Sequence, residues 1–125
     1  MADDRVQLTQ STPVLGASDY ERARLFYRDQ LGFSVVEEGG EPPRFGIFRR
    51  DRALLYVDSW KGARQPVRNL WSAYIHVTGL AGLAQEFQAA GVTLTRDITE
   101  TVYGMREFEV TDPDGNIVCF GEDIE

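Results

Sequence analysis

The feature that most restricts the fold of this chain is an order of elements that occurs twice along it. Each copy has a strand-like segment, a helical pattern that ends at a glycine, and a further strand directly after that glycine. The two glycines are Gly32 and Gly91, and glycine is favoured just past a helix because it adopts positive φ at little cost. Two copies of about 50 residues, offset by about 60, indicate two βαβββ modules. The sequence therefore predicts an α+β fold.

Local patterns place the other elements. A capping box, Ser18-x-x-Glu21, predicts where the first helix begins, and Thr78 is the expected N-cap of the second. Predicted strands cover residues 12–17, 33–37, 45–49 and 53–59 in the first copy. The second copy is expected to have strands at 72–77 and 92–95, a polar loop at 97–101 and a hairpin within 103–122.

The hairpin within 103–122 is the most strongly patterned part of the chain. Phe108 and Val110 alternate with Glu107 and Glu109, which is typical of a half-buried strand. The sequence Asp-Pro-Asp-Gly at 112–115 predicts the turn. We interpret the two glutamates as the solvated face of the strand, and the apolar run at 117–120 as buried.

Length and charge exclude several classes of protein. A chain of 125 residues, 42% hydrophobic, is expected to form one domain over 1–125, with modules at about 11–59 and 71–122 and a linker at 60–70. A net charge of −7 argues against nucleic-acid binding. No apolar run approaches the roughly 18 residues of a membrane helix, and no leader pattern is present. A single cysteine is typical of a reducing, cytoplasmic setting.

Three motifs are characteristic beyond their local structure. They are Pro-Val-Leu-x-x-x-Asp at 13–19, the Phe-Tyr and Leu-Gly-Phe pair at 26–33, and Asp-Pro-Asp-Gly-Asn at 112–116. In these motifs the chain resembles the vicinal oxygen chelate superfamily, which includes glyoxalase I, extradiol dioxygenases and bleomycin-resistance proteins. Over about 11–122 the chain is most similar to the bleomycin-resistance proteins, especially at 106–116. The resemblance implies a cup-shaped mixed sheet with helices outside. It also implies a homodimer that exchanges N-terminal strands at a proline hinge, which Pro13 matches.

The resemblance also provides a test for metal-dependent chemistry. Enzymes of the superfamily bind a divalent metal through His, Glu or Gln side chains at four positions, which here correspond to Thr12, Tyr56, Ser72 and Cys119. None carries the carboxylate or imidazole that such ions require. His76 has no suitably spaced partner, and Cys119 has no recognisable activating base. We therefore expect neither a metal or other cofactor nor enzymatic activity.

A cup without a metal binds by shape, stacking and charge. The resemblance implies that Phe45 and Tyr103 stack on a flat ligand. Strand alternation places Tyr74 with His76, and Tyr56 with Asp58, on the cup side. Trp60 and Trp71 flank the linker and are candidates for lining the opening, although core packing fits Trp71 better. The predicted ligand-binding residues are Phe45, Tyr56, Asp58, Trp60, Trp71, Tyr74, His76 and Tyr103.

The sequence leaves three functions open. The first is a protein that sequesters a cationic, planar antibiotic of the bleomycin family without modifying it. The second is a glyoxalase-like or dioxygenase-like metalloenzyme whose ligands are displaced from the positions above, and the third is a binder of another planar molecule. The residue types at the four metal positions favour a binding protein over the enzyme.

Overall fold

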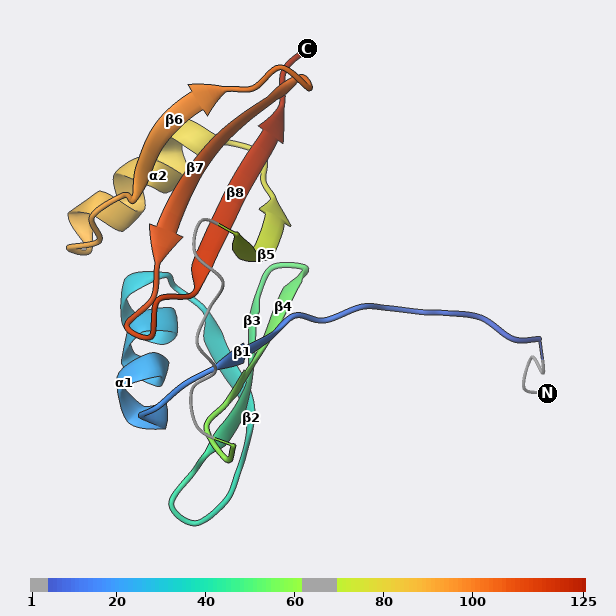
Figure 1. Cartoon of the computed structure of the whole chain (residues 1–125), viewed down its shortest axis with the longest axis vertical. Helices are drawn as coiled ribbons and strands as arrows, with labels where there is room; N and C mark the ends of the chain where they lie inside the picture. Colours follow the sequence, from blue (N-terminus) through green and yellow to red (C-terminus); the bar gives the residue numbers. More distant parts are fainter. Residues whose placement is uncertain (1–4, 62–69) are drawn as a thin grey trace.

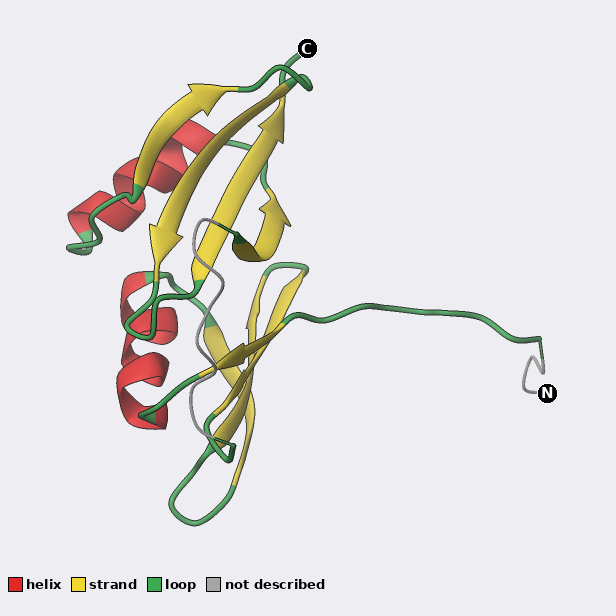
Figure 2. Cartoon of the chain, viewed as in Figure 1, coloured by secondary structure: helices red, strands yellow, loops and turns green. Residues whose placement is uncertain are grey.

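The computed structural model describes residues 5–61 and 70–125. The chain forms two mixed sheets of four strands each, and the helices cover one face of each sheet (Figures 1 and 2). We call the face away from the helices the open face of each sheet. The predicted α+β class with two βαβββ modules is confirmed, and the strands form two separate sheets. Most of the predicted linker lies outside the described residues.

The first module contains the helix that ends before Gly32 and the strands on either side of that helix in the sequence. Its elements are β1 (Val14–Gly16), α1 (Tyr20–Leu25), a π-helical turn η1 (Phe26–Gln30), β2 (Ser34–Gly39), β3 (Phe45–Arg50) and β4 (Ala53–Asp58). The strand order is β1-β4-β3-β2, with β1 parallel to β4. Gly32 has φ of 75°, as its place after the helix predicts.

The second module repeats this arrangement. Its elements are β5 (Trp71–His76), α2 (Leu80–Ala89), β6 (Arg96–Glu100), β7 (Met105–Thr111) and β8 (Ile117–Asp123). The strand order is β5-β8-β7-β6, with β5 parallel to β8. Gly91 again has positive φ, at 89°.

Both helix starts differ from the sequence prediction. Asp19, not Ser18, is the N-cap of α1, and its carboxylate accepts a 3.2 Å hydrogen bond from the Arg22 amide. Ser18 instead donates from its amide and its hydroxyl to Asp114, at 3.0 and 2.7 Å. The second helix begins after Gly79, whose φ is 84° and whose amide donates to Glu122. Thr78 is therefore not its cap.

The prediction of a strand at 92–95 is also wrong. The strand in this part of the chain is β6, Arg96–Glu100, which covers most of the segment predicted as a polar loop at 97–101. It lies at the sheet edge, pairs with β7 alone among the described strands, and is largely solvent-exposed. An edge strand of this kind needs no apolar alternation, so its sequence has the composition of a loop.

The core lies between the helices and the covered faces of the sheets. In the first module Tyr27 packs against Phe33 and Phe48, with ring centroids 6.3 and 6.1 Å apart. In the second module Phe87 of α2 packs against Phe108 and Phe120 of the sheet, at 5.9 and 5.2 Å. These rings fill most of the space between the helices and the covered faces.

The N-terminal segment lies apart from the two sheets. Before β1 the chain extends away from the rest of the molecule (Figure 1). Val6 and Leu8 in this segment are 95% and 97% exposed. Among the described helices, none is both long enough and apolar enough to span a bilayer.

Candidate functional site

The open face of the first sheet carries three aromatic side chains in contact. Phe45 of β3 and Tyr56 of β4 make an edge-to-face pair with centroids 5.4 Å apart. Trp60, just beyond β4, lies parallel to Phe45, with an interplanar angle of 6° and a centroid separation of 5.9 Å. Trp60 is 53% exposed, so this group presents an aromatic surface to solvent.

Two features of the backbone hold Trp60 in this place. Asp58 accepts a 2.9 Å hydrogen bond from the Trp60 amide, which defines the bend after β4. On β2, where Gly39 pairs with Phe45, a Cβ at Gly39 would lie 3.2 Å from Cη2 of Trp60, closer than ordinary packing allows. The pairing Phe45↔Asp58 places the Asp58 carboxylate on the same open face as the aromatic group.

The open face of the second sheet carries a matching row of rings along β5. Trp71 and Tyr74 have centroids 5.0 Å apart, and so have Tyr74 and His76. The pairing of β5 with β8 is irregular between Trp71 and Ala73, and a bulge of this kind redirects side chains. Trp71 is 43% exposed, so the expectation that it packs in the core is wrong.

The Tyr74 side chain extends over β8 because the strand has a glycine, Gly121, at that position. A Cβ at Gly121 would overlap the Tyr74 hydroxyl. That hydroxyl is buried, and no described residue hydrogen-bonds to it with good geometry. Burial, followed by the neighbouring Glu107 carboxylate, raises the pKa of Tyr74.

Below these rings lies a group of charged side chains, which we call the Glu107 network. Glu107 accepts hydrogen bonds from the Tyr103 hydroxyl at 2.7 Å and from Arg96 at 3.0 Å. Arg96 also makes a 3.1 Å ion pair with Glu109, and Glu109 accepts a 2.9 Å hydrogen bond from Nε1 of Trp71. The network thus connects β6 and β7 to Tyr103 and Trp71, two of the predicted ligand-binding residues.

Glu107 does not lie on a solvated face, contrary to the prediction from its alternation. Its exposure is 0%. Burial alone would raise its pKa, but the Tyr103 and Tyr74 hydroxyls and the Arg96 guanidinium outweigh that effect and lower it. Glu107 is therefore a buried carboxylate anion at neutral pH. The sequence shows that Tyr103 and Arg96 lie close to Glu107 along the chain. That both side chains hydrogen-bond to Glu107 depends on the tertiary fold.

Cys119 is buried on the same face, as predicted for a residue in the apolar run of β8. It pairs across the sheet with Tyr74 on one side and Glu109 on the other. Burial, with Glu107 and Glu109 nearby, raises the pKa of its thiol to about 12. Such a thiol is protonated at neutral pH and is a poor nucleophile or metal ligand.

The residues at the four superfamily metal positions do not fit a divalent ion. Thr12, Tyr56, Ser72 and Cys119 offer hydroxyl and thiol groups only, and Ser72 lies 3.3 Å from the Asn116 side chain, to which it is hydrogen-bonded. No group of three or more His, Cys, Asp or Glu side chains in the described part of the chain is arranged to hold a metal. These four side chains therefore do not form a divalent-metal site.

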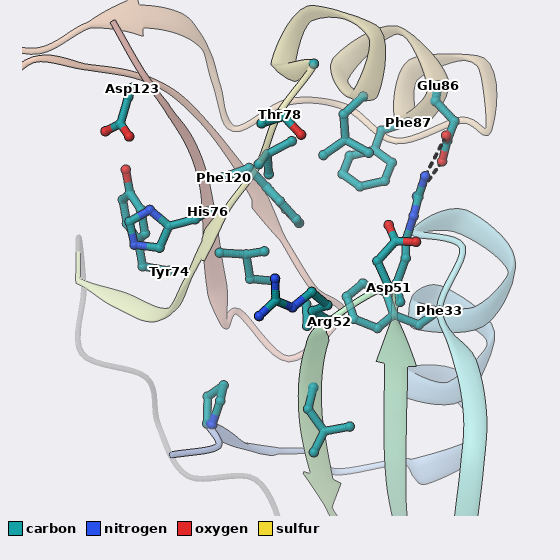
Figure 3. A pocket seen from close by; sticks show the side chains of 18 of the residues that line it. Phe33, Asp51, Arg52, Tyr74, His76, Thr78, Glu86, Phe87, Phe120 and Asp123 are labelled. Carbon is teal, nitrogen blue, oxygen red and sulfur yellow. Dashed lines mark hydrogen bonds and ion pairs between the residues drawn. The ribbon is translucent and has the colours of Figure 1, made fainter. Parts of the chain in front are cut away.

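A groove of about 980 Å³ lies between the two modules (Figure 3). It is lined by the β3–β4 turn, the edge of β5 and one side of α2, and Arg50 pairs with Glu86 across it at 2.6 Å. Of the eight predicted ligand-binding residues, only Tyr74 and His76 line it. The predicted residues are instead divided equally between the two open faces, and no ring contact among residues 5–61 and 70–125 joins the two groups.

Comparison with known proteins places the chain in a family. The sequence model described as "Glyoxalase/Bleomycin resistance protein/Dioxygenase superfamily" matches residues 9–120. A bleomycin resistance protein from Geobacillus stearothermophilus is 25% identical, in an alignment that covers 94% of this chain and 99% of the relative.

Solved structures show the same similarity. The bleomycin-binding protein from Streptomyces verticillus, solved with copper(II)-bleomycin, is 30% identical, with a TM-score of 0.72 over 93% of this chain and 97% of that one. A lactoylglutathione lyase from Agrobacterium tumefaciens is 21% identical, with a TM-score of 0.71 over 94% and 96% of the two chains. The second likeness concerns the fold alone, which carries both binding proteins and enzymes.

Proposed function

Because this chain belongs to the glyoxalase/bleomycin resistance protein/dioxygenase superfamily, we propose that it binds and sequesters an antibiotic of the bleomycin family without a metal and without modifying it. The observation that carries the proposal is the exposed aromatic group on each open face. Flat heteroaromatic rings gain roughly 0.5–1.5 kcal/mol per ring pair from offset or edge-to-face contact, beyond area burial.

The first open face has the geometry of a stacking platform. Phe45 and Trp60 are already parallel, and Trp60 is 53% exposed. The bleomycin tail is planar and cationic, so it is suited to such a surface. The Streptomyces verticillus protein, whose structure contains copper(II)-bleomycin, supports this choice of ligand over other planar molecules.

Charge favours the same ligand. The chain carries a net charge of −7, and Asp58 and Glu37 lie on the first open face beside the rings. An acidic surface attracts a cation over a Debye length of about 8 Å at physiological salt. We therefore propose that the cationic tail of the drug binds beside Asp58 and Glu37.

Binding without catalysis follows from residue chemistry. The positions that carry metal ligands in superfamily enzymes hold hydroxyl and thiol groups here, and burial suppresses the nucleophilicity of Cys119. Neither a Lewis-acid role nor a nucleophilic role is provided for at these positions.

The proposal includes a homodimer. Among the described residues no ring contact joins the two aromatic groups, and the extended N-terminal segment exposes Val6 and Leu8. Exchange of this segment at Pro13 would bury both side chains. It would also set the first open face of one copy opposite the second open face of its partner. A ligand would then contact residues of both chains.

The test is a titration of the purified protein with metal-free and copper-loaded bleomycin, followed by calorimetry and by tryptophan fluorescence. We expect binding at micromolar or lower concentration, with one drug per chain, and a loss of about tenfold in affinity for Trp60→Ala. Mass spectrometry of the recovered drug should show it unchanged. No heat at roughly tens of micromolar would overturn the proposed ligand, and a modified drug would overturn the assignment as a binding protein.

Metal analysis distinguishes the proposed binding protein from a metalloenzyme of the same superfamily. The superfamily includes enzymes, so the purified chain should be assayed for bound transition metal. One equivalent per chain, retained through dialysis, would favour a metalloenzyme whose ligands lie elsewhere. We expect none to be retained.

A further inference from the structure

Two rings on the second open face share one unusual feature. The Tyr103 hydroxyl donates to Glu107 at 2.7 Å, and the Trp71 indole N–H donates to Glu109 at 2.9 Å. Each aromatic side chain thus points its only acidic proton at a carboxylate. The rings themselves stay accessible, with Tyr103 58% and Trp71 43% exposed.

Arg96 places the two carboxylates relative to each other. Its guanidinium lies 3.0 Å from Glu107 and 3.1 Å from Glu109, and its own side chain is 34% exposed. Two carboxylates and one guanidinium leave the network with one net negative charge. Since Glu107 is fully buried and Glu109 is 17% exposed, this charge lies beneath the rings and is poorly screened.

A hydrogen bond from a ring to an anion has two effects. It is short and strong because the acceptor is charged, so it restricts the ring to one orientation. It also shifts electron density from the O–H or N–H bond into the ring, which makes the π face more negative. A more negative face attracts a cation placed over it, an interaction of about 0.5–2 kcal/mol depending on exposure.

Stability of the fold alone does not account for the network. A buried ion pair pays a desolvation cost, and apolar residues of similar volume often serve a fold as well or better. The network also ends on exposed rings rather than on core residues. Its geometry is therefore better explained by what the rings present to solvent.

We propose that Glu107 and Glu109 are positioning residues that make Tyr103 and Trp71 an electron-rich pair, selective for flat cationic heteroaromatic ligands over neutral rings of the same shape. The inference rests on the proposed function only in taking the second open face as a ligand-binding face. It specifies the ligand class more narrowly, and it assigns a role to side chains that touch no ligand themselves.

The probes are N-methylacridinium and acridine at mildly alkaline pH, where acridine is neutral and the two rings are nearly identical in shape. Calorimetry or fluorescence gives the ratio of their dissociation constants for the full-length chain. We expect the wild type to prefer the cation by about tenfold, and Glu107→Gln or Glu109→Gln to reduce that preference about three- to tenfold. The glutamine amide still accepts a hydrogen bond, so the rings keep their places while the charge is lost.

The matched control is Asp123→Asn. Asp123 lies on the same face of β8 as Cys119 and Gly121, lines the groove beside His76 (Figure 3), and hydrogen-bonds to no described ring. This variant removes the same charge without touching a ring. It should change the preference less than twofold, which is the size of a general surface-charge effect. An equal loss in all three variants would overturn the inference.

A double-mutant cycle tests whether each carboxylate acts through its ring. In a Tyr103→Phe background, Glu107→Gln should have almost no further effect on the preference, because the link between them is already cut. Glu109→Gln should likewise have almost no further effect with Trp71→Phe. The second pair keeps the test valid if Glu107→Gln fails to fold. Additive effects in both cycles would overturn the inference.

The inference and the proposed function fail separately. Bleomycin binding with no preference for N-methylacridinium over acridine leaves the proposed function in place and overturns the inference. A cation preference that passes the cycles, without bleomycin binding, supports the inference and overturns the proposed ligand. Failure of the chain to bind any of the three probes overturns both.

Discussion

The hydroxyl of Tyr27, in the first module, donates a 2.8 Å hydrogen bond to Asp112, at the turn of the hairpin of the second module. Both residues are buried. Burial and the Asp112 carboxylate raise the pKa of Tyr27, so the phenol stays protonated. The Asn116 side chain donates from the same turn to the Gly16 carbonyl at 3.0 Å. The Asp-Pro-Asp-Gly-Asn segment is thus both a turn and one of the connections between the modules.

Tyr27→Phe and Asp112→Ala should therefore destabilise the protein to different extents. Tyr27→Phe removes one donor and leaves Asp112 bonded to the Asn116 side chain and to the amides of the turn, so we expect a loss of about 1 kcal/mol. Asp112→Ala leaves several buried donors without an acceptor, and about 3 kcal/mol or more should be lost. Urea denaturation measures both.

Tyr56→Phe is the control for these two variants, because Tyr56 lies on the open face of the first sheet. It should cost less than about 0.5 kcal/mol, as surface changes usually do. Equal losses in Tyr27→Phe and Tyr56→Phe would show that the hydrogen bond between the modules adds nothing to stability.

The buried carboxylate of Glu107 predicts a pH dependence of stability. Its pKa in the folded protein lies below the ordinary value of 4.5, so the ionised form favours folding. This contribution is fully present above the ordinary value and is lost as pH falls through the folded value. The stability difference between wild type and Glu107→Gln should therefore be largest at neutral pH and shrink below about pH 4.5. Denaturation at several pH values measures it.

Glu86→Gln provides a comparison with an exposed pair. The Arg50 guanidinium lowers the pKa of Glu86 too, outweighing burial, but half of the Glu86 side chain is exposed. The sign of the pH effect should be the same, but the effect should be smaller and should fall with added salt. A pH effect at Glu107 that salt removes equally well would contradict its burial in the folded protein.

Patterns that depend on close neighbours were predictable from the sequence. The positive φ at Gly32, Gly91 and Gly115 follows from their places after a helix or within a turn. The sharing of faces by Tyr74 with His76, and by Tyr56 with Asp58, follows from strand alternation. These local rules were sufficient to predict the repeated βαβββ order and which aromatic residues share one face of a strand, but not that the strands form two separate sheets.

Features set by distant partners were not predictable. Ser18 is not the cap of α1 because its hydroxyl donates a hydrogen bond to Asp114, which lies far along the chain. Glu107 alternates like a solvated residue, yet the Tyr103 ring and Arg96 of β6 bury it. The strand β6 itself has the composition of a loop because it is an edge strand, with β7 as its one partner in the described part of the chain. In each case tertiary contacts override the local pattern.

Cys119 should be almost unreactive in the folded protein. Its pKa is raised from 9.0 to about 12, so at mildly alkaline pH the thiolate fraction falls by about a thousandfold. Alkylation by iodoacetamide should be at least that much slower than in urea, where the thiol regains its ordinary pKa. Mass spectrometry over time measures the two rates. Rapid modification of the native protein would contradict the burial of this thiol on the open face of the second sheet.

Gly121→Ala tests whether an empty position in β8 is required for the placement of Tyr74. The new methyl group would overlap the Tyr74 hydroxyl, so the ring must leave the face or the strands must separate. Overpacking of this kind costs about 1–3 kcal/mol, and affinity for a stacking ligand should fall with it. Gly82→Ala is the matched control, since nothing lies within 4 Å of a Cβ there and the residue is inside α2. It should stabilise the protein by about 0.5–1 kcal/mol, because alanine favours a helix over glycine. Both substitutions add one methyl group. If urea denaturation shows a lower free energy of unfolding for Gly121→Ala and a higher one for Gly82→Ala, the loss comes from the overlap with Tyr74 and not from the replacement of a glycine.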